Sequence, residues 1–328
     1  MLPSELKKQE KKELLTKKEY KTNPEYGSVP EKRKTEDIIN YGVVNIDKPE
    51  GPTSHQVSFY VQQILGLDKS GHAGTLDPKV TGVLPVALGK ATRIVEYLLK
   101  AGKEYVCLMH IHKNLPEQEI REAMNQFIGK INQLPPKKSS VKRVERERTI
   151  YYLEILEIEG QDVLFRVGTQ AGTYIRKLCH DIGQKLESGA HMSELRRTKA
   201  ATFDESTLVT LHDLKDAFDY YKKGNDKFLR KVIQPVEKVI EFFPSIYVID
   251  TTVDSLCHGS TLKIPGISKL DSNINKGDII AVMTLKNELI GMGISFMSTE
   301  EIMQKNKGIV AKIEKVFMQT GLYPKLNN

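Results

Sequence analysis

Hydrophobic and polar residues alternate along several short stretches of the chain, and this period-two pattern predicts strands. A β-branched run over 42–47 and the alternation over 104–112 each indicate one strand. Two further alternating runs, 149–158 and 162–169, flank a Glu-Gly-Gln turn at 159–161. These two runs are therefore expected to pair as a β-hairpin.

Three stretches between the predicted strands show the residue spacing of helices. Ser54 is a residue type that caps helix N-termini, and it precedes a helical pattern over 57–65. Further helices are predicted over 117–131 and over 174–186, the second of them closed by Gly189. Helices mixed with mainly antiparallel strands in one long unit predict the α+β fold class.

Two segments outside this unit differ from it in composition. Charges alternate in sign over 6–18, which is typical of an exposed helix or a frayed arm. Beyond Phe243-Pro244 the chain becomes a series of short apolar runs separated by turns. The runs that predict the strands of this small β-rich module are 246–249, 278–284, 289–294 and 309–316.

The charge balance and the cysteine content limit the classes of function. The formal net charge of +7 favours a polyanionic partner such as nucleic acid, although charge alone leaves the question open. Three widely separated cysteines indicate a reducing compartment and argue against a disulfide framework. The charged N-terminal segment is unlike a signal peptide, and no apolar run is long enough to cross a bilayer. We therefore expect a soluble, cytoplasmic protein without a membrane partner.

The segment from Gly71 to Gly82 has an unusual concentration of chemical groups. It combines three glycines with a histidine, a carboxylate and a proline. Glycines allow the backbone to approach a ligand closely, and Pro78 restricts the preceding Asp77 to extended geometry. An aspartate displayed in this way can act as a nucleophile or as a base. Because Asp-Pro pairs are also common in ordinary turns, the local pattern leaves both interpretations open.

Two familiar kinds of site do not match the sequence. The stretch over 88–92 partly matches a phosphate-binding loop, but that loop requires glycine at Leu84 and serine or threonine at Ala91. The histidines and cysteines, including His110 and His112 on one predicted strand, do not have the spacing of zinc ligands. We therefore expect neither a metal nor a cofactor.

Basic residues in two segments provide further candidate chemistry. The helix predicted after Gly172 presents Tyr174 and Arg176 in its first turn, where a guanidinium can pair with a carboxylate of another loop. An ordinary surface arginine is the alternative. The segment 134–148 is rich in lysine and arginine, so it either closes over a phosphate backbone or is a solvated loop. A further basic group follows at Arg196, Arg197 and Lys199.

Five motifs in this order resemble the TruB superfamily of pseudouridine synthases, and most closely its archaeal dyskerin-type branch, which works with H/ACA guide RNA. The motifs lie at 45–54, 71–78, 103–105, 172–176 and 189–197, so the resemblance covers nearly all of 41–241. The tail over 245–322 is similar to a PUA domain, which is an RNA-binding β-module. One departure lies at 199–202, where a glycine usually follows the double arginine of the last motif.

The resemblance implies an RNA pseudouridine synthase with a defined set of site residues. Asp77 is implied as the catalytic aspartate, with Arg176 as its partner and Tyr105 as the ring that stacks on the flipped base. His72, Tyr174 and Lys48 are implied to contact the nucleotide or its neighbours. The residues of the basic segment that we expect to contact the RNA backbone are Lys137, Lys138, Arg143 and Arg146.

The resemblance also implies a domain organisation and a set of partners. We expect a charged arm over 1–38, a catalytic domain over 39–242 and a PUA domain over 243–328. The expected partners are guide RNA, rRNA and tRNA, together with small H/ACA accessory proteins and a kink-turn-binding protein. Two alternatives stay open, namely a stand-alone synthase for the tRNA T-loop and a non-catalytic RNA-binding scaffold of a ribonucleoprotein.

Overall fold

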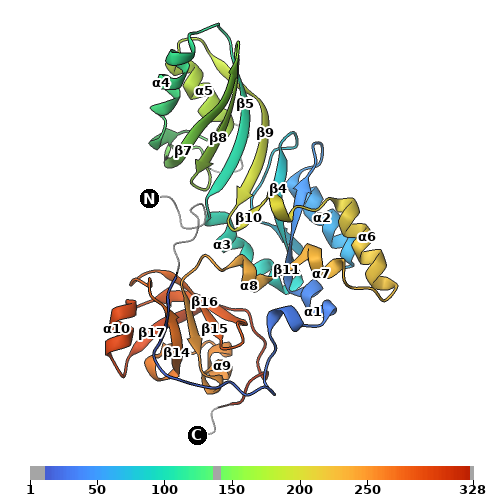
Figure 1. Cartoon of the computed structure of the whole chain (residues 1–328), viewed down its shortest axis with the longest axis vertical. Coiled ribbons are helices and arrows are strands. Elements are labelled where there is room, and N and C mark those ends of the chain that lie inside the picture. The colour runs from blue at the N-terminus through green and yellow to red at the C-terminus, as the bar shows by residue number, and fades with distance from the viewer. Residues whose placement is uncertain (1–11, 136–141, 326–328) are drawn as a thin grey trace. The chain divides into compact units, whose positions relative to one another are not determined.

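The computed structural model describes residues 12–135 and 142–325, and these form two compact units (Figure 1). Within the described residues, the first unit comprises Val44–Ala87 and Val95–Lys223, and the second comprises 12–43, Leu88–Ile94 and 224–325. No helix in this described part of the chain is long and apolar enough to span a membrane.

The first unit is built on one long, mainly antiparallel sheet. Its strands are hydrogen-bonded in the order β2-β4-β9-β5-β8-β7-β6, with β3 attached to β4 and β10 attached to β9. β4 and β9 run parallel, whereas β5 pairs in antiparallel fashion with both β8 and β9. The bounds are β2 Gly42–Lys48, β3 Ser70–His72, β4 Thr81–Leu88, β5 Lys103–Ile111, β6 Gly129–Gln133, β7 Arg146–Glu159, β8 Asp162–Thr169, β9 Ala190–Ala200 and β10 Phe203–Asp204.

Helices α4 (Glu117–Asn125) and α5 (Ile175–Lys185) lie together beside β5, β7 and β8 (Figure 1). Cys107 and Met109 of β5 and Phe165 of β8 share one core cluster with Leu178 and Ile182 of α5, and all five side chains are fully buried. Burying a large apolar side chain contributes roughly 1.5–3 kcal/mol. The core therefore fixes α5 firmly against the sheet, and with it the first turn that carries Arg176.

Sequence periodicity predicts most of these elements, with errors at their ends. The β7–β8 hairpin and the strand over 104–112 are confirmed. The helix predicted over 117–131 ends at Asn125, because the chain turns there and enters β6, whose Lys130 pairs with Thr149 of β7. α2 (Ser54–Leu65) is capped by Thr53 rather than by Ser54. The pattern of apolar residues does not predict α3 (Val95–Lys100), α6 (Leu211–Lys222) or the long strand β9.

The second unit contains a β-rich module, as the sequence predicts. Its strands are hydrogen-bonded in the order β1-β14-β12-β15-β16-β17-β13. The strand bounds are β1 Leu14–Thr16, β12 Ser245–Val248, β13 Leu262–Lys263, β14 Ile267–Asp271, β15 Ile279–Thr284, β16 Leu289–Ser295 and β17 Ile309–Val316. This unit also includes α1 Thr35–Asn40, α7 Leu229–Val232, β11 Ile233–Pro235, α8 Val236–Val239, α9 Asp250–Cys257 and α10 Thr299–Gln304.

The described part of the N-terminal segment belongs to this second sheet instead of forming the expected helix or frayed arm. β1 pairs in antiparallel fashion with β14, with Leu15 opposite Leu270. The Lys12 ammonium donates to the carbonyl oxygen of Phe243 at 2.5 Å and lies 3.7 Å from the Asp271 carboxylate. The expectation of a helix or frayed arm over 6–18 is therefore wrong for the described residues of that range. The segment forms a strand because its hydrogen-bonding partners lie far along the chain, and its own charge pattern does not show them.

Candidate active site

The loop that carries Asp77 runs from β3 to β4 and is anchored on both sides of that residue. The Leu76 amide donates to Ser54 Oγ at 2.8 Å, and the Gly51 amide donates to the carbonyl oxygen of Pro78 at 3.0 Å. Leu76 is buried, whereas about half of the Asp77 side chain is exposed, with a relative accessibility of 52%. The motif at 45–54 thus holds the backbone of the motif at 71–78, so that Asp77 is presented to solvent.

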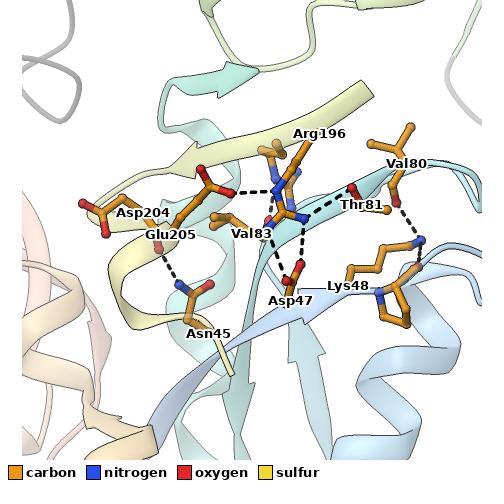
Figure 2. Close-up of polar contacts among 11 residues, drawn as sticks. Asn45, Asp47, Lys48, Val80, Thr81, Val83, Arg196, Asp204 and Glu205 are labelled. Atoms are coloured by element: carbon orange, nitrogen blue, oxygen red, sulfur yellow. Dashed lines mark hydrogen bonds and ion pairs between the residues drawn. The ribbon is translucent and has the colours of Figure 1, made fainter. Parts of the chain in front are cut away.

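Lys48 anchors the same loop from the interior of the unit. Its fully buried ammonium donates to the carbonyl oxygens of Pro49 at 2.8 Å and Pro78 at 3.0 Å. It also donates to that of Val80 at 2.8 Å (Figure 2). Burial lowers the pKa of this ammonium. Because each of its three donors already has an acceptor, we propose that Lys48 positions the loop, in place of the substrate contact expected from the sequence.

Asp77 and Arg176 form an ion pair between the carboxylate Oδ2 and the guanidinium Nη2. The Arg176 side chain is as exposed as its partner, with a relative accessibility of 55%. An exposed pair of this kind contributes on the order of 0–1 kcal/mol to stability, so we infer that the pair serves to orient the carboxylate. The structure forms the pairing that the sequence left open, and its catalytic role stays a prediction.

The start of α5 is fixed by the end of β6. The side chain of Gln133, which is buried, accepts a hydrogen bond from the Tyr174 amide at 2.9 Å and donates to the Tyr174 carbonyl oxygen at 3.2 Å. These two bonds hold the backbone immediately before the helix that carries Arg176. The sequence does not predict this role for Gln133. A single glutamine in a polar segment gives no signal that it will be buried beside another loop.

Tyr105 and His72 lie on strands that border the same loop. Tyr105 is half-buried on β5, where it stands opposite Val167 of β8 and Arg197 of β9. His72 is the last residue of β3, and its Nδ1 atom is buried. Burial lowers the pKa of its imidazole, although a hydrogen bond with the Gly74 backbone opposes this shift. His72 is therefore suited to act as a neutral hydrogen-bonding group beside the loop.

Arg196 connects the first motif to the last one. Its guanidinium donates to the two carboxylate oxygens of Asp47 at 3.0 and 3.2 Å and to Glu205 at 2.7 Å (Figure 2). The hydrogen bond to Asp47 is the main reason that the pKa of Arg196 is raised. In Figure 2, Asn45 of the first motif also donates to the Asp204 carbonyl oxygen, at 2.9 Å. The sequence presents Arg196 only as one member of a basic group, without indicating these acidic partners.

The basic segment is only partly described by the structure. Lys137 and Lys138 lie outside the described residues, so their predicted RNA contacts stay predictions. Arg143 and Arg146 are exposed, and Arg146 begins β7 opposite Gln133 of β6. Because Gln133 also holds the start of α5, Arg146 lies on the strand pair that leads to the candidate site, and Arg143 lies three residues before it.

Three histidines lie close together around β5 and β9: His110 is on β5, His112 directly follows it, and His191 is on β9. The rings of His110, His112 and His191 have centroids 5.2–6.2 Å apart, and His112 Nε2 lies 2.9 Å from His191 Nδ1. His110 Nδ1 is 2.8 Å from the Asp162 carboxylate. Within the residues that the structure describes, no group of three His, Cys, Asp or Glu side chains is arranged to hold a metal ion.

Family models match this chain in consecutive segments. The DKCLD (NUC011) domain matches 1–58, and the N-terminal domain of TruB family pseudouridylate synthases matches 62–118 and 110–175. The C-terminal domain of tRNA pseudouridylate synthase B matches 176–241, and the PUA domain matches 244–317. The matched segments include every candidate residue discussed above.

Whole-chain relatives agree with these models. Probable tRNA pseudouridine synthase B of Pyrococcus abyssi is 54% identical over 99% of this chain and 97% of its own length, and that of Methanosarcina barkeri is 55% identical over 93% and 90%. Among solved structures, a chain of a Cbf5-Nop10-Gar1 complex is 53% identical with a TM-score of 0.93, and one in an H/ACA RNP bound to a substrate RNA containing 2'-deoxyuridine is 51% identical with a TM-score of 0.92. Each of these two comparisons covers 99% of both chains. The chain therefore belongs to the TruB family of pseudouridylate synthases and is an isomerase of uridine in RNA.

Proposed function

We propose that this chain is the catalytic subunit of an H/ACA guide ribonucleoprotein and converts uridine to pseudouridine in rRNA, in tRNA or in both, with Asp77 at the centre of the reaction. The observation that carries the assignment of the site is the solvent-facing ion pair of Asp77 with Arg176, on a loop anchored at both sides. An arginine bound at Oδ2 orients the carboxylate and leaves Oδ1 for the nucleotide.

The reaction is an isomerisation, so substrate and product contain the same atoms. The bond between N1 of uracil and C1′ of ribose breaks, the base turns, and a bond forms between C5 and C1′. The proton on C5 is released to solvent, and N1 takes up a proton. Asp77 acts as the nucleophile, either on C1′ or on the pyrimidine ring. No oxidant, reductant or energy source enters this balance.

The remaining site residues bind and orient the nucleotide. A uridine must leave its stack to reach Asp77, which costs a few kcal/mol. Stacking on the Tyr105 ring offsets about 1–3 kcal/mol of this. His72 and Tyr174 lie on the two segments that flank the ion pair, and they contact the nucleotide or its neighbours. Arg143, Arg146, Lys137 and Lys138 contact phosphates of the RNA.

The partners follow from the proteins that this chain resembles. Solved structures of similar chains are described as a Cbf5-Nop10-Gar1 complex and as an H/ACA RNP bound to a substrate RNA. We assign to this chain a guide RNA, small H/ACA accessory proteins and a kink-turn-binding protein. The catalytic domain covers 39–242, and the PUA domain, which binds guide RNA, covers 243–328. The protein acts in the cytoplasm. The match of the PUA model to 244–317 supports this boundary.

A tritium-release assay tests the assignment of Asp77. The full chain is incubated with RNA that carries tritium at uridine C5, first as a tRNA transcript alone and then with guide RNA and the accessory proteins. Asp77→Asn is expected to bind RNA normally and to release no tritium. Asp68→Asn, which changes an exposed carboxylate nine residues earlier in the chain, is the matched control and should retain full activity. Turnover by Asp77→Asn would refute the assignment.

A stand-alone tRNA synthase is the second candidate function. The names of the curated relatives, probable tRNA pseudouridine synthase B, favour it. Release of tritium from the tRNA transcript without guide RNA supports this candidate. Release that requires the guide and the accessory proteins supports the ribonucleoprotein instead.

A further inference from the structure

Arg197 of β9 is the largest fully buried side chain in the described part of the molecule, with 1% of its surface exposed. Burying a cation is unfavourable unless its donors are satisfied. An arginine keeps its charge in a protein and has five N–H donors but no acceptor. No carboxylate forms an ion pair with Arg197 among the described residues. A side chain that served only to fill this space would be apolar, so the guanidinium requires another explanation.

The backbone acceptors of Arg197 lie on the two sides of the Asp77 loop. Its Nε donates to the carbonyl oxygen of Val83 at 2.7 Å, and its Nη2 donates to that of Gly74 at 3.4 Å. Gly74 lies three residues before Asp77, and Val83 lies six residues after it. Arg197 therefore connects the start of the loop to the strand that follows it.

Gly74 permits this close approach. Its φ of +125° is a conformation that favours glycine, and a Cβ atom there would lie 3.2 Å from Nη1 of Arg197. Any larger residue would press against the guanidinium. Gly74 and Arg197 can therefore pack this closely because residue 74 has no side chain.

The third group that Arg197 contacts is the hydroxyl of Tyr105. The two residues stand opposite each other across β5 and β9, and the Tyr105 side chain interacts electrostatically with the Arg197 guanidinium. Because arginine can only donate, it is the oxygen of the Tyr105 hydroxyl that is attracted to the guanidinium. The hydrogen of the Tyr105 hydroxyl then points away from Arg197.

We propose that Arg197 is a positioning residue for the isomerisation, which fixes the Asp77 loop and the Tyr105 hydroxyl relative to each other and leaves the Tyr105 hydrogen available to the flipped nucleotide. The proposal rests on the assignment of Asp77 and Tyr105 to the reaction. Arg197 touches neither the nucleotide nor the Asp77 carboxylate, and it acts through the residues that do.

Arg197→Lys tests the proposal while preserving the charge, because a single ammonium cannot reach all three acceptors in the same geometry. With the full chain and its RNA, the single-turnover rate should fall on the order of 10²-fold, as expected for a small misplacement of reacting groups. RNA affinity should change little. Arg166→Lys is the matched control, because Arg166 is an exposed arginine on β8, and it should leave both quantities unchanged.

Tyrosine labelled with carbon-13 at Cζ provides a readout that is independent of turnover. Loss of one signal in Tyr105→Phe identifies the Tyr105 resonance among the 13 tyrosines. This signal should shift in Arg197→Lys and stay unchanged in Arg166→Lys. A folded Arg197→Lys protein with an unshifted Tyr105 signal would overturn the proposal. If wild type releases no tritium, the assignment of the site fails, while the labelled tyrosine still reports on the contact.

Two further variants separate positioning from a general loss of stability. In a Tyr105→Phe background, Arg197→Lys should lower the single-turnover rate much less than it does in wild type, because the two residues act together. An equal fold-change in both backgrounds would mean that Arg197 has only a structural role. Gly74→Ala keeps Arg197 but displaces its guanidinium, so it should shift the Tyr105 signal even if Arg197→Lys does not fold. An unshifted signal in folded Gly74→Ala contradicts the proposal.

Discussion

The two units of the chain bury charges of opposite sign. Among its described residues, the first unit buries three cations, Lys48, Lys103 and Arg197, and a single carboxylate, Glu104. The second unit buries the carboxylates of Glu237, Asp250, Asp254, Asp271 and Glu288 and no lysine or arginine to the same degree within its described residues. Both arrangements are costly unless hydrogen bonds satisfy the charge, so each must match the groups that surround it.

The buried cations of the first unit donate to backbone carbonyl oxygens, most of which lie in loops. Lys48 binds the carbonyls of Pro78 and Val80 within the Asp77 loop, and Arg197 binds those of Gly74 in the loop and Val83 in β4. Lys103 donates to carbonyl oxygens in the last turn of α3 and just after it. The shortest of these hydrogen bonds, to the carbonyl oxygen of Ala101, measures 2.6 Å. Loop carbonyls lack the partners that a strand or helix provides. A rigid catalytic loop can therefore be built without regular structure.

Two buried carboxylates of the second unit, Asp250 and Glu288, accept from the two terminal segments. Asp250 accepts from Thr22 Oγ1 at 2.9 Å and from the Asn23 amide at 2.8 Å. Glu288 accepts from the Ser28 amide at 3.0 Å and from the Tyr323 hydroxyl at 2.5 Å. The comparison teaches that the sign of a buried charge follows the backbone groups left unpaired nearby, which are carbonyls around the site and amides in the crossing segments.

The largest effect is expected when a buried cation of the first unit is removed. Lys48→Met leaves the carbonyls of Pro49, Pro78 and Val80 without their donor. We expect a loss of about 3–5 kcal/mol in the free energy of unfolding, similar to breaking other buried charge networks, and loss of tritium release. Urea titration measures the stability, with the exposed Lys69→Met as control. If Lys48→Met were as stable as this control, buried cations would not hold the loop.

Removal of a buried carboxylate should act on the second unit instead. Glu288→Gln keeps the shape of the side chain but weakens its bonds to Ser28 and Tyr323. We expect a loss of about 1–3 kcal/mol, typical of an impaired buried hydrogen-bonded group. Hydrogen exchange should show faster exchange at the Ser28 amide, whereas the exposed Glu300→Gln should not. Unchanged exchange would show that the carboxylates do not fasten the N-terminal segment.

Glu104 is the exception within the first unit, because it is a carboxylate buried to the same degree as the cations. Burial opposes its ionisation, but hydrogen bonds from Tyr152 and Thr198 and the ammonium of Lys199 outweigh burial and lower the pKa of the Glu104 carboxyl. A lowered folded-state pKa contributes stability above the ordinary value of 4.5, and this contribution is lost as the pH falls through the folded-state pKa.

The Glu104→Gln variant should therefore differ most from wild type near neutral pH, by about 1–3 kcal/mol, and the difference should shrink below pH 4.5. Unfolding curves at several pH values measure this difference. Glu157→Gln, an exposed change on β7, should show no such trend. A difference that grows as the pH falls has the wrong sign and would contradict the assigned ionisation of Glu104.

The exposed cations should have the smallest effect on stability. Arg143→Gln and Arg146→Gln change surface residues, so we expect the free energy of unfolding to stay within about 0.5 kcal/mol. If each arginine contacts a phosphate, each change should reduce the slope of log affinity against log salt by about 1. Filter binding at several salt concentrations measures this slope. A slope that does not change would remove these two residues from the RNA contact.

The sequence predicts the elements whose pattern is local. The β7–β8 hairpin is readable because its alternation and its turn at Gly160 lie within one stretch of chain. β9 is missed because its charged residues, among them Arg196 and Arg197, conceal the alternation of a strand whose neighbours are distant in sequence. The same distance hides the burial of Gln133 and the pairing of β1 with β14.

The candidate site shows the same division. The motifs identify Asp77, Tyr105 and Arg176 by residue type and order, and they carry the family resemblance without any knowledge of contacts. Only the tertiary structure brings Arg176 to Asp77 and separates the basic residues into classes. Arg196 pairs with carboxylates, whereas its neighbour Arg197 is buried against carbonyls and Tyr105. The physical reason is that adjacent residues of a strand point to opposite faces, and only the packed neighbours decide whether a face is buried, which charges it meets and what its side chains do.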